Sequence, residues 1–190
     1  MSTARRLHYT YADYLQVLEI SNVKLEYCDG VIYAMAGGTP AHAALSAAAT
    51  RLLGNALAGR CIAYSYSSDL KVRVEATDLS TFPDGAVICG AVRTAEIDPH
   101  AAVNPVILVE ITSRSTEDYD RGEKLSHYKQ IPSLRAVLFV SHKTPRVTLV
   151  QRTASGWDER EFRAGESVTI SEPASSFSVD DLYAGISLDA

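Results

Sequence analysis

The sequence predicts an α/β fold in which helices flank a mixed central sheet. Two apolar runs, residues 105–112 and 136–140, lack the polar alternation of a half-exposed strand, so each indicates a strand that is covered on both faces. Residues 41–58 and 117–130 are rich in helix-forming residues and can supply such cover. The C-terminal part predicts two alternating strands that continue the sheet antiparallel and a closing helical turn, at residues 146–152, 157–162 and 178–183.

Length and composition are those of an ordinary globular protein. With 190 residues, 46% of them hydrophobic and 22% charged, the chain can bury one full core, and one domain spanning residues 1–190 is expected. The net charge of −5 excludes a generally polycationic nucleic-acid binder but allows a local basic cleft. Because no apolar leader region follows Arg5 and Arg6 and no run reaches membrane-spanning length, we expect a cytoplasmic protein without a membrane partner.

Three cysteines, Cys28, Cys61 and Cys89, are isolated from one another and lie among apolar neighbours. An odd number of scattered cysteines argues against a disulfide framework, and their spacing is not that of a zinc site. We expect all three to be small core residues.

Near the N-terminus the sequence predicts a short amphipathic helix, which Thr10 can cap, and a hairpin. Residues 23–27 and 31–35 are strand-like and are joined through Asp29-Gly30, a strong signal for a hairpin turn. Alternation places Glu26 on the polar face of the first strand, where a solvated carboxylate is the simplest interpretation.

A long helix is expected from residue 41 to residue 58, with Thr39 as its cap and Pro40 at its first position. His42 lies in the first turn, where the helix dipole disfavours the imidazolium. It is either a neutral histidine that faces a site at this end or a surface residue. One stripe of the helix is expected to approach the sheet closely: Ala44, Leu45, Ala48, Leu52 and Ala56.

The next segment contains a first acidic candidate, Asp84. Residues 61–74 predict a strand whose second half is half-exposed, because charged and apolar residues alternate there, and residues 75–81 predict a polar connector. A short buried strand is expected at residues 86–89. Asp84, in the Phe-Pro-Asp-Gly sequence before that strand, either belongs to an ordinary turn or points from the start of the strand toward Glu110.

Glu110 is the second acidic candidate, because it places a carboxylate inside the first apolar run. Burial of an ionised carboxylate without a partner costs several kcal/mol. Glu110 should therefore face a solvent cleft, a cation or a metal, and a salt bridge at the end of the strand is the simplest alternative.

Lys124 is the cationic candidate. After a polar loop that ends at the capping residue Thr116, a helix is expected to bury Leu125 and Tyr128. Lys124 lies at the border of that buried face, where a long side chain can follow apolar surface and carry its ammonium into a neighbouring cleft.

These residues, in this order, resemble a known group of enzymes. Pro83-Asp84, Glu110 at the end of a core strand and a lysine on the following helix resemble the PD-(D/E)xK nucleases, whose fold is restriction-endonuclease-like, and more closely the Uma-two (Uma2) family of endonucleases within that group. The family's glutamate hairpin is similar to residues 25–30, and its histidine at a helix start is similar to His42.

The lysine departs from the superfamily pattern. Thr112 stands where the superfamily motif has its lysine, whereas similar Uma2 proteins carry the lysine on the next helix. Tyr119-Asp120-Arg121-Gly122-Glu123-Lys124-Leu125 matches that helical segment, so Lys124 is the residue that the resemblance implies. The resemblance covers nearly the whole chain, from Leu7 to Tyr183.

The resemblance implies a metal-dependent endonuclease that acts on DNA in preference to RNA. Phosphodiester hydrolysis requires neutralisation of phosphate charge, a nucleophilic water and stabilisation of the leaving oxygen. Oxygen ligands of this kind suit Mg²⁺ or Mn²⁺. The implied metal ligands are Asp84, Glu110, the carbonyl of Ile111 and Glu26. The implied catalytic residues are Lys124, Glu110, Asp84, Glu26 and His42, with Lys124 orienting or deprotonating the attacking water.

A second interpretation stays open from the sequence. The chain can be a catalytically silent member of the same fold that serves as a nucleic-acid-binding or protein-interaction module. A degenerate site would leave Lys124 in solvent and Asp84 far from Glu110. Cleavage of both strands of a duplex would favour a two-fold homodimer, for which exposed apolar and alternating strands near the C-terminus are the expected contact.

Overall fold

The computed structural model describes residues 7–35, 37–59, 63–67, 69–112 and 117–189. The predicted cap Thr116, the loop before it and Cys61 lie outside these residues. The helices and strands, in chain order, are α1 (Tyr11–Ile20), β1 (Leu25–Cys28), β2 (Val31–Ala34), α2 (Pro40–Leu57), β3 (Ala63–Ser67), β4 (Lys71–Val74), the 3₁₀ helix η1 (Glu75–Thr77), β5 (Leu79–Thr81), β6 (Gly85–Cys89), β7 (Thr94–Ala95), β8 (Asp98–Ala102), β9 (Ile107–Thr112), α3 (Glu117–Tyr119), the π-helix η2 (Asp120–Lys124), α4 (Leu125–Tyr128), β10 (Ala136–Ser141), β11 (Arg146–Thr153), β12 (Gly156–Arg163), β13 (Ser167–Ile170), β14 (Ser175–Ser178) and α5 (Val179–Tyr183).

The central sheet has the strand order β12-β11-β10-β9-β6-β3. β9 pairs in parallel with β10 and antiparallel with β6, while β10, β11 and β12 follow one another antiparallel, so the sheet is mixed. Every residue of β9 and β10 is buried, which explains why neither run shows polar alternation. The predicted α/β fold with a mixed central sheet between helices is confirmed.

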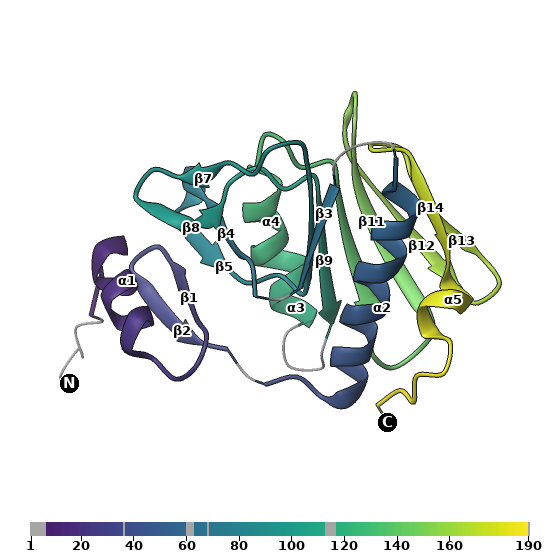
Figure 1. Ribbon diagram of the computed structural model, residues 1–190, viewed down its shortest axis with the longest axis horizontal. Helices are drawn as coiled ribbons and strands as arrows, with labels where there is room; N and C mark the ends of the chain where they lie inside the picture. The colour runs from purple at the N-terminus through teal and green to yellow at the C-terminus, as the bar shows by residue number, and fades with distance from the viewer. Residues whose placement is uncertain (1–6, 36, 60–62, 68, 113–116, 190) are drawn as a thin grey trace.

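Different layers cover the two faces of this sheet (Figure 1). α2 packs on one face together with α5 and the β13–β14 pair, whereas α4 and part of a second sheet pack on the other. Ile107, Val109 and Ile111 of β9 face α2, and Leu108 faces Tyr128 of α4. Because side chains alternate along a strand, Glu110 lies on the same face as Leu108, toward α4.

The buried stripe of α2 differs from the predicted one. Its members are four residues apart: Ala41, Leu45, Ala49, Leu53 and Leu57. Of the predicted set only Leu45 is buried, and the others lie half-buried along the edge of the stripe: Ala44, Ala48, Leu52 and Ala56. Apolar side chains surround much of α2, so the sequence alone does not determine which line faces the sheet. No helix in the described ranges is both long and apolar enough to cross a membrane.

The second sheet has the strand order β2-β1-β5-β4-β8-β7. The predicted β1–β2 hairpin and the capped helix α1 are confirmed. The polar connector expected over residues 75–81 is wrong in its second half, because Leu79, Ser80 and Thr81 form a buried strand between β1 and β4. Strands β7, β8, β13 and β14 had no counterpart in the prediction.

β4 is fully buried rather than half-exposed. Its two charged residues find buried partners in the second sheet and α1. Lys71 Nζ lies 2.7 Å from Asp98 Oδ2, and the Arg73 guanidinium lies 3.7 Å from the centre of the Tyr11 ring. The alternating pattern was therefore misread as exposure, because it does not show which charged residues are neutralised inside the fold. Cys28 is buried as expected, and Cys89 is half-buried.

Candidate active site

Asp84 lies directly before β6 and reaches the end of β9. Its Oδ2 accepts a hydrogen bond of 2.7 Å from the backbone N–H of Ile111. The register pairs Gly85 with Val109, so Asp84 stands level with Glu110 on the neighbouring strand. A Cβ atom on Gly85 would lie 3.3 Å from the Val109 Cβ, so glycine permits this close approach. Of the two interpretations of Asp84, the one that points it toward the strand of Glu110 is confirmed, and the turn is wrong.

Glu110 is 4% exposed and faces a cation. Its Oε1 lies 3.1 Å from Lys124 Nζ and accepts a hydrogen bond from the Tyr128 hydroxyl. Burial raises the pKa of Glu110 to about 8, against the opposing effect of Lys124 and with the help of the nearby Asp84 and Asp120 charges. Of the surroundings predicted for Glu110, the structure provides the cation, in a salt bridge with Lys124, and the Glu110 side chain is buried.

Lys124 is 4% exposed and contacts three carboxylates. Its Nζ lies 3.1 Å from Glu110, 3.5 Å from Glu26 and 3.8 Å from Asp120. Burial opposes the charge, but the surrounding carboxylates raise the pKa of Lys124 well above its usual value, so the group stays an ammonium. The π-helical segment η2 ends at Lys124 and starts at Asp120, and such segments are frequent at functional sites.

Glu26 is 9% exposed, so its interpretation as a solvated carboxylate is wrong. The second sheet explains the difference, because β1 lies between β2 and β5 and all four of its residues are buried. Glu26 Oε1 accepts hydrogen bonds from the Thr81 hydroxyl and, at 3.4 Å, from the backbone N–H of Phe82. The β1–β5 pairing therefore aims Glu26 at Lys124.

His42 occupies the first turn of α2 and contacts Asp84. Its Nε2 lies 3.2 Å from Asp84 Oδ2, and a quarter of its side chain (25%) is exposed. The hydrogen bond to Asp84 raises the pKa of His42, against desolvation. His42 therefore faces a site at this end of α2, as one of the two interpretations expected, and Asp84 favours its protonated form against the helix dipole. The alternative of a mere surface histidine is wrong.

Two members of the cluster were not among the predicted site residues. Asp120 precedes Lys124 by one helical turn and pairs with it, a spacing that could have identified it. Tyr128 was expected to be buried, but its hydrogen bond to Glu110 depends on how the helix lies on β9. Thr112, at the position of the superfamily lysine, donates a 3.4 Å hydrogen bond to the carbonyl of Val140.

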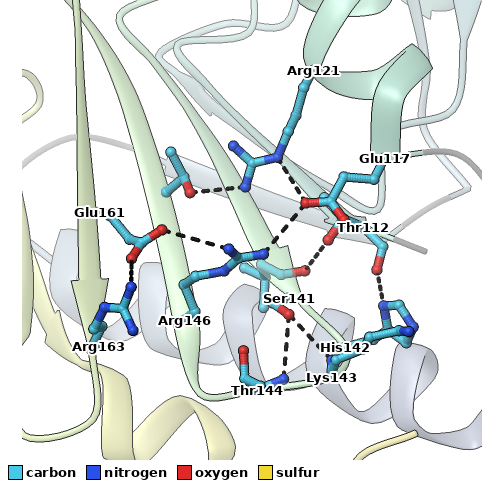
Figure 2. A network of polar contacts seen from close by, with 12 residues as sticks. Thr112, Glu117, Arg121, Ser141, His142, Lys143, Thr144, Arg146, Glu161 and Arg163 are labelled. Atoms are coloured by element: carbon cyan, nitrogen blue, oxygen red, sulfur yellow. Dashed lines mark hydrogen bonds and ion pairs between the residues drawn. The ribbon is translucent and has the colours of Figure 1, made fainter. Parts of the chain in front are cut away.

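A network of ion pairs beside the cluster ties the Lys124 helix to the sheet (Figure 2). Glu117 of α3 lies 3.1 Å from Arg121 Nε and 3.4 Å from an Arg146 nitrogen. Arg121 also donates a 2.9 Å hydrogen bond to the hydroxyl of Thr148 on β11. Arg146 continues the network to Glu161 on β12 at 3.6 Å. These contacts fix the helix that carries Lys124 on β11 and β12 of the central sheet.

The charges of the cluster fit a divalent cation. Four carboxyl groups lie around one ammonium and one imidazole, so acidic groups outnumber basic ones; the acidic groups are Glu26, Asp84, Glu110 and Asp120, and the basic groups Lys124 and His42. Among the described residues, three of these carboxylates make their contacts through one oxygen each: Glu26 Oε1, Asp84 Oδ2 and Glu110 Oε1. The second oxygen of each is the hard ligand that Mg²⁺ or Mn²⁺ would take.

Comparison with known proteins gives a consistent answer. A family model described as "Uma2: Putative restriction endonuclease" matches residues 11–183. Two proteins of Synechocystis sp. that bear the name "uncharacterized protein" are similar. The protein slr1290 is 34% identical over 181 residues, 92% of this chain and 90% of the relative. The protein sll1609 is 28% identical over 143 residues, 75% of this chain and 80% of the relative.

A solved structure shares the fold. The crystal structure of a "putative nuclease belonging to DUF820" from Anabaena variabilis superposes with a TM-score of 0.73 at 17% sequence identity. The match covers 90% of this chain and 96% of the other. The same arrangement of sheet and helices is therefore retained although most side chains differ.

Proposed function

The chain belongs to the Uma2 family, and from this premise we propose that it is a metal-dependent endonuclease that hydrolyses phosphodiester bonds, in DNA in preference to RNA. The observation that carries the proposal is the convergence of Glu26, Glu110 and Lys124 on one buried point next to Asp84. These groups come from three separate elements: a strand of the central sheet, a hairpin of the second sheet and a helix. Ordinary ion pairs at the protein surface do not explain such an arrangement. The family's description as a restriction endonuclease supports DNA as the substrate.

The proposed metal ligands are Asp84 and Glu110, completed by Glu26 and the carbonyl of Ile111. A bound Mg²⁺ or Mn²⁺ would neutralise phosphate charge and lower the pKa of a bound water. The excess of carboxylates supports this assignment. The pKa of Glu110, raised to about 8, supports it further, because a buried acid of this kind gains a partner when a cation replaces its proton.

Lys124 is proposed to position the attacking water and to stabilise negative charge on the phosphate. Because the carboxylates keep its pKa high, Lys124 is suited to act as a fixed positive charge and hydrogen-bond donor rather than as a general base. Glu26, which contacts Lys124 at 3.5 Å, would hold the ammonium in place. His42, a quarter of whose side chain is exposed, would assist next to Asp84.

The proposed homodimer needs a different contact from the one expected at the C-terminus. The edge strand β12 presents mostly charged residues, which disfavour edge pairing. The large apolar side chains that are exposed in the described ranges lie elsewhere: Leu7, Ile20, Val23, Tyr33, Val92 and Ile97. Sedimentation at micromolar concentration, with and without duplex DNA, tests whether two copies associate.

A cleavage assay tests the proposed function. Wild type should cut duplex or single-stranded DNA with Mg²⁺ or Mn²⁺, cut RNA of the same sequence more slowly, and lose activity in EDTA. Lys124→Met should be inactive under conditions in which Lys129→Met, a neighbouring lysine over the Trp157 ring, stays active. Binding of nucleic acid without cleavage under every metal condition would instead support the catalytically silent module.

A further inference from the structure

A second group of metal-ligating side chains lies next to the candidate active site, at Cys28, Glu123 and His127. Cys28 Sγ lies 3.7 Å from His127 Nε2, which lies 3.9 Å from Glu123 Oε1. One ligand atom from each of the three residues lies within 4.8 Å of the others. β1 contributes the thiol, and the helical segment η2–α4 contributes the other two ligands.

The distances fit a tetrahedral ion. Zinc binds sulfur at about 2.3 Å and imidazole nitrogen at about 2.0–2.1 Å, which places the two ligand atoms about 3.6 Å apart in a tetrahedron. The 3.7 Å between Cys28 Sγ and His127 Nε2 already has this length. Glu123 needs only a small side-chain movement, and its side chain is 64% exposed and can move. Three protein ligands would leave a fourth position for water.

The ligand types differ from those of the carboxylate cluster. A thiolate and an imidazole select Zn²⁺ over Mg²⁺, whereas the all-oxygen set around Glu110 selects the reverse. The ordinary alternative is a weak hydrogen bond between the Cys28 thiol and the imidazole together with an ion pair between Glu123 and His127, which lie one helical turn apart. In a metal site the same carboxylate, which faces the imidazole nitrogen that contacts the thiol, would supply the third ligand.

The position connects the two halves of the candidate active site. Cys28 follows Glu26 by two residues, so both side chains leave β1 on one face, and Glu123 directly precedes Lys124. Cys28 also belongs to the apolar cluster that contains Leu125 and Tyr128. An ion held by Cys28 and His127 would therefore join the N-terminal hairpin to the helix beside the contact between Glu26 and Lys124.

We propose that Cys28, Glu123 and His127 form a zinc site, separate from the proposed nuclease centre, that clips the N-terminal hairpin to the Lys124 helix. Binding replaces the thiol proton with a sulfur–metal bond, and the proton leaves to solvent. The site does not depend on nuclease activity. The proposal adds a role for Cys28 to its place in the core.

Cobalt and zinc titrations of the full chain, freed of metal by EDTA and dialysis, test the site. Addition of Co²⁺ to wild type should produce a thiolate-to-cobalt charge-transfer absorption that saturates at one equivalent and disappears when Zn²⁺ is added. The absorption should be lost in Cys28→Ser and retained in Cys89→Ala, a variant at a half-buried cysteine outside the cluster. His127→Gln and Glu123→Gln should each weaken Zn²⁺ binding by at least about tenfold, measured by competition with a chromogenic chelator.

Two further variants distinguish zinc binding at this site from zinc binding at the nuclease centre and from an effect of misfolding. Glu110→Gln should bind Zn²⁺ as wild type does, whatever its effect on cleavage, because Glu110 is not a proposed zinc ligand. Glu123→Gln changes an exposed side chain, so it keeps the test decisive if Cys28→Ser fails to fold. An absorption that is absent in wild type, or Zn²⁺ affinity that is equal in wild type and Glu123→Gln, would overturn the proposal and leave a thiol–imidazole hydrogen bond. Affinity that falls only in Glu110→Gln would assign the zinc to the carboxylate cluster.

Discussion

Lys124 Nζ lies 3.1 Å from Glu110 Oε1, although one residue belongs to a helix and the other to a central strand of the sheet beneath it. Glu26 and Asp120 also lie near the ammonium. Loss of Lys124 would therefore leave a group of buried carboxylates without their cation. Substitutions of these two residues should have opposite effects on stability. Lys124 neutralises part of the negative charge of the cluster, whereas Glu110 adds to that charge when it is ionised.

Lys124→Met should abolish cleavage and weaken the fold. Removal of a positioned charge from the reacting phosphate is expected to lower the cleavage rate by about 10²- to 10⁴-fold. Orphaning of the buried carboxylates should lower the free energy of unfolding by about 3–5 kcal/mol in EDTA. Cleavage kinetics and urea unfolding measure the two effects, with Lys129→Met as the matched control. Cleavage at the wild-type rate by the folded variant would remove Lys124 from the mechanism.

Glu110→Gln should stabilise the metal-free protein near neutral pH. The folded pKa of Glu110, about 8, lies above its ordinary value of 4.5. A raised pKa contributes stability that is present below the unfolded pKa and is lost as pH rises through the folded pKa. The unfolding free energy of wild type in EDTA should therefore fall between about pH 4.5 and about pH 8.

Glu110→Gln should remove the part of this pH-dependent loss of unfolding free energy that comes from Glu110. Glutamine keeps an acceptor for the Tyr128 hydroxyl and has no charge to bury. Melting temperatures measured in EDTA across this range should be higher for Glu110→Gln than for wild type at about pH 7.5 and should converge toward low pH. Glu19→Gln, an exposed residue of α1, serves as control. A variant less stable than wild type at every pH would mean that the pairing with Lys124 outweighs the desolvation of Glu110.

Asp84→Asn should make the stability of the protein much less sensitive to Mg²⁺ or Mn²⁺. Asparagine retains an oxygen that can accept the Ile111 N–H, so the strand contact survives while one proposed metal ligand is lost. Mg²⁺ or Mn²⁺ at about 100 times its dissociation constant should stabilise wild type by about 2.7 kcal/mol and the variant much less. Thermal melts with metal and with EDTA test this, and Asp69→Asn, in the exposed pair with Lys24, is the control. Equal indifference of wild type and Asp84→Asn to both ions would contradict the metal site.

The sequence predicted those parts of the molecule in which one residue pattern has one physical meaning. Apolar runs without alternation have to be covered on both faces, so β9 and β10 were identified correctly. Alternation is ambiguous, because it also arises when buried partners such as Asp98 neutralise charged residues such as Lys71. The strand character of β5 was hidden for a related reason: its Ser80 and Thr81 are buried.

The prediction of the site was limited because a local residue pattern does not show how distant strands pair with one another. Asp84, Glu110 and Lys124 were selected by residue type and position, but only the pairing of Gly85 with Val109 brings the first two to one level. Glu26 was misjudged, and His42 was left open between two interpretations, because each was weighed without its partner. The partner of Glu26 is Lys124, and that of His42 is Asp84.

His42 should titrate above its ordinary pKa of 6.5, because its Nε2 contacts the Asp84 carboxylate. A raised histidine pKa gives stability that is fully present below the unfolded pKa and is lost as pH rises through the folded pKa, so the pair should stabilise the fold most in mildly acidic solution. Nuclear magnetic resonance of the imidazole protons should show an inflection above 6.5 in EDTA, and Asp84→Asn should lower it. Mg²⁺ should lower it as well, because a cation on Asp84 would repel the imidazolium. Asp69→Asn, in the exposed pair with Lys24, should leave the inflection of His42 unchanged. An inflection at or below 6.5 that ignores both the substitution and Mg²⁺ would show that the helix dipole governs His42 after all, and would detach it from the proposed site.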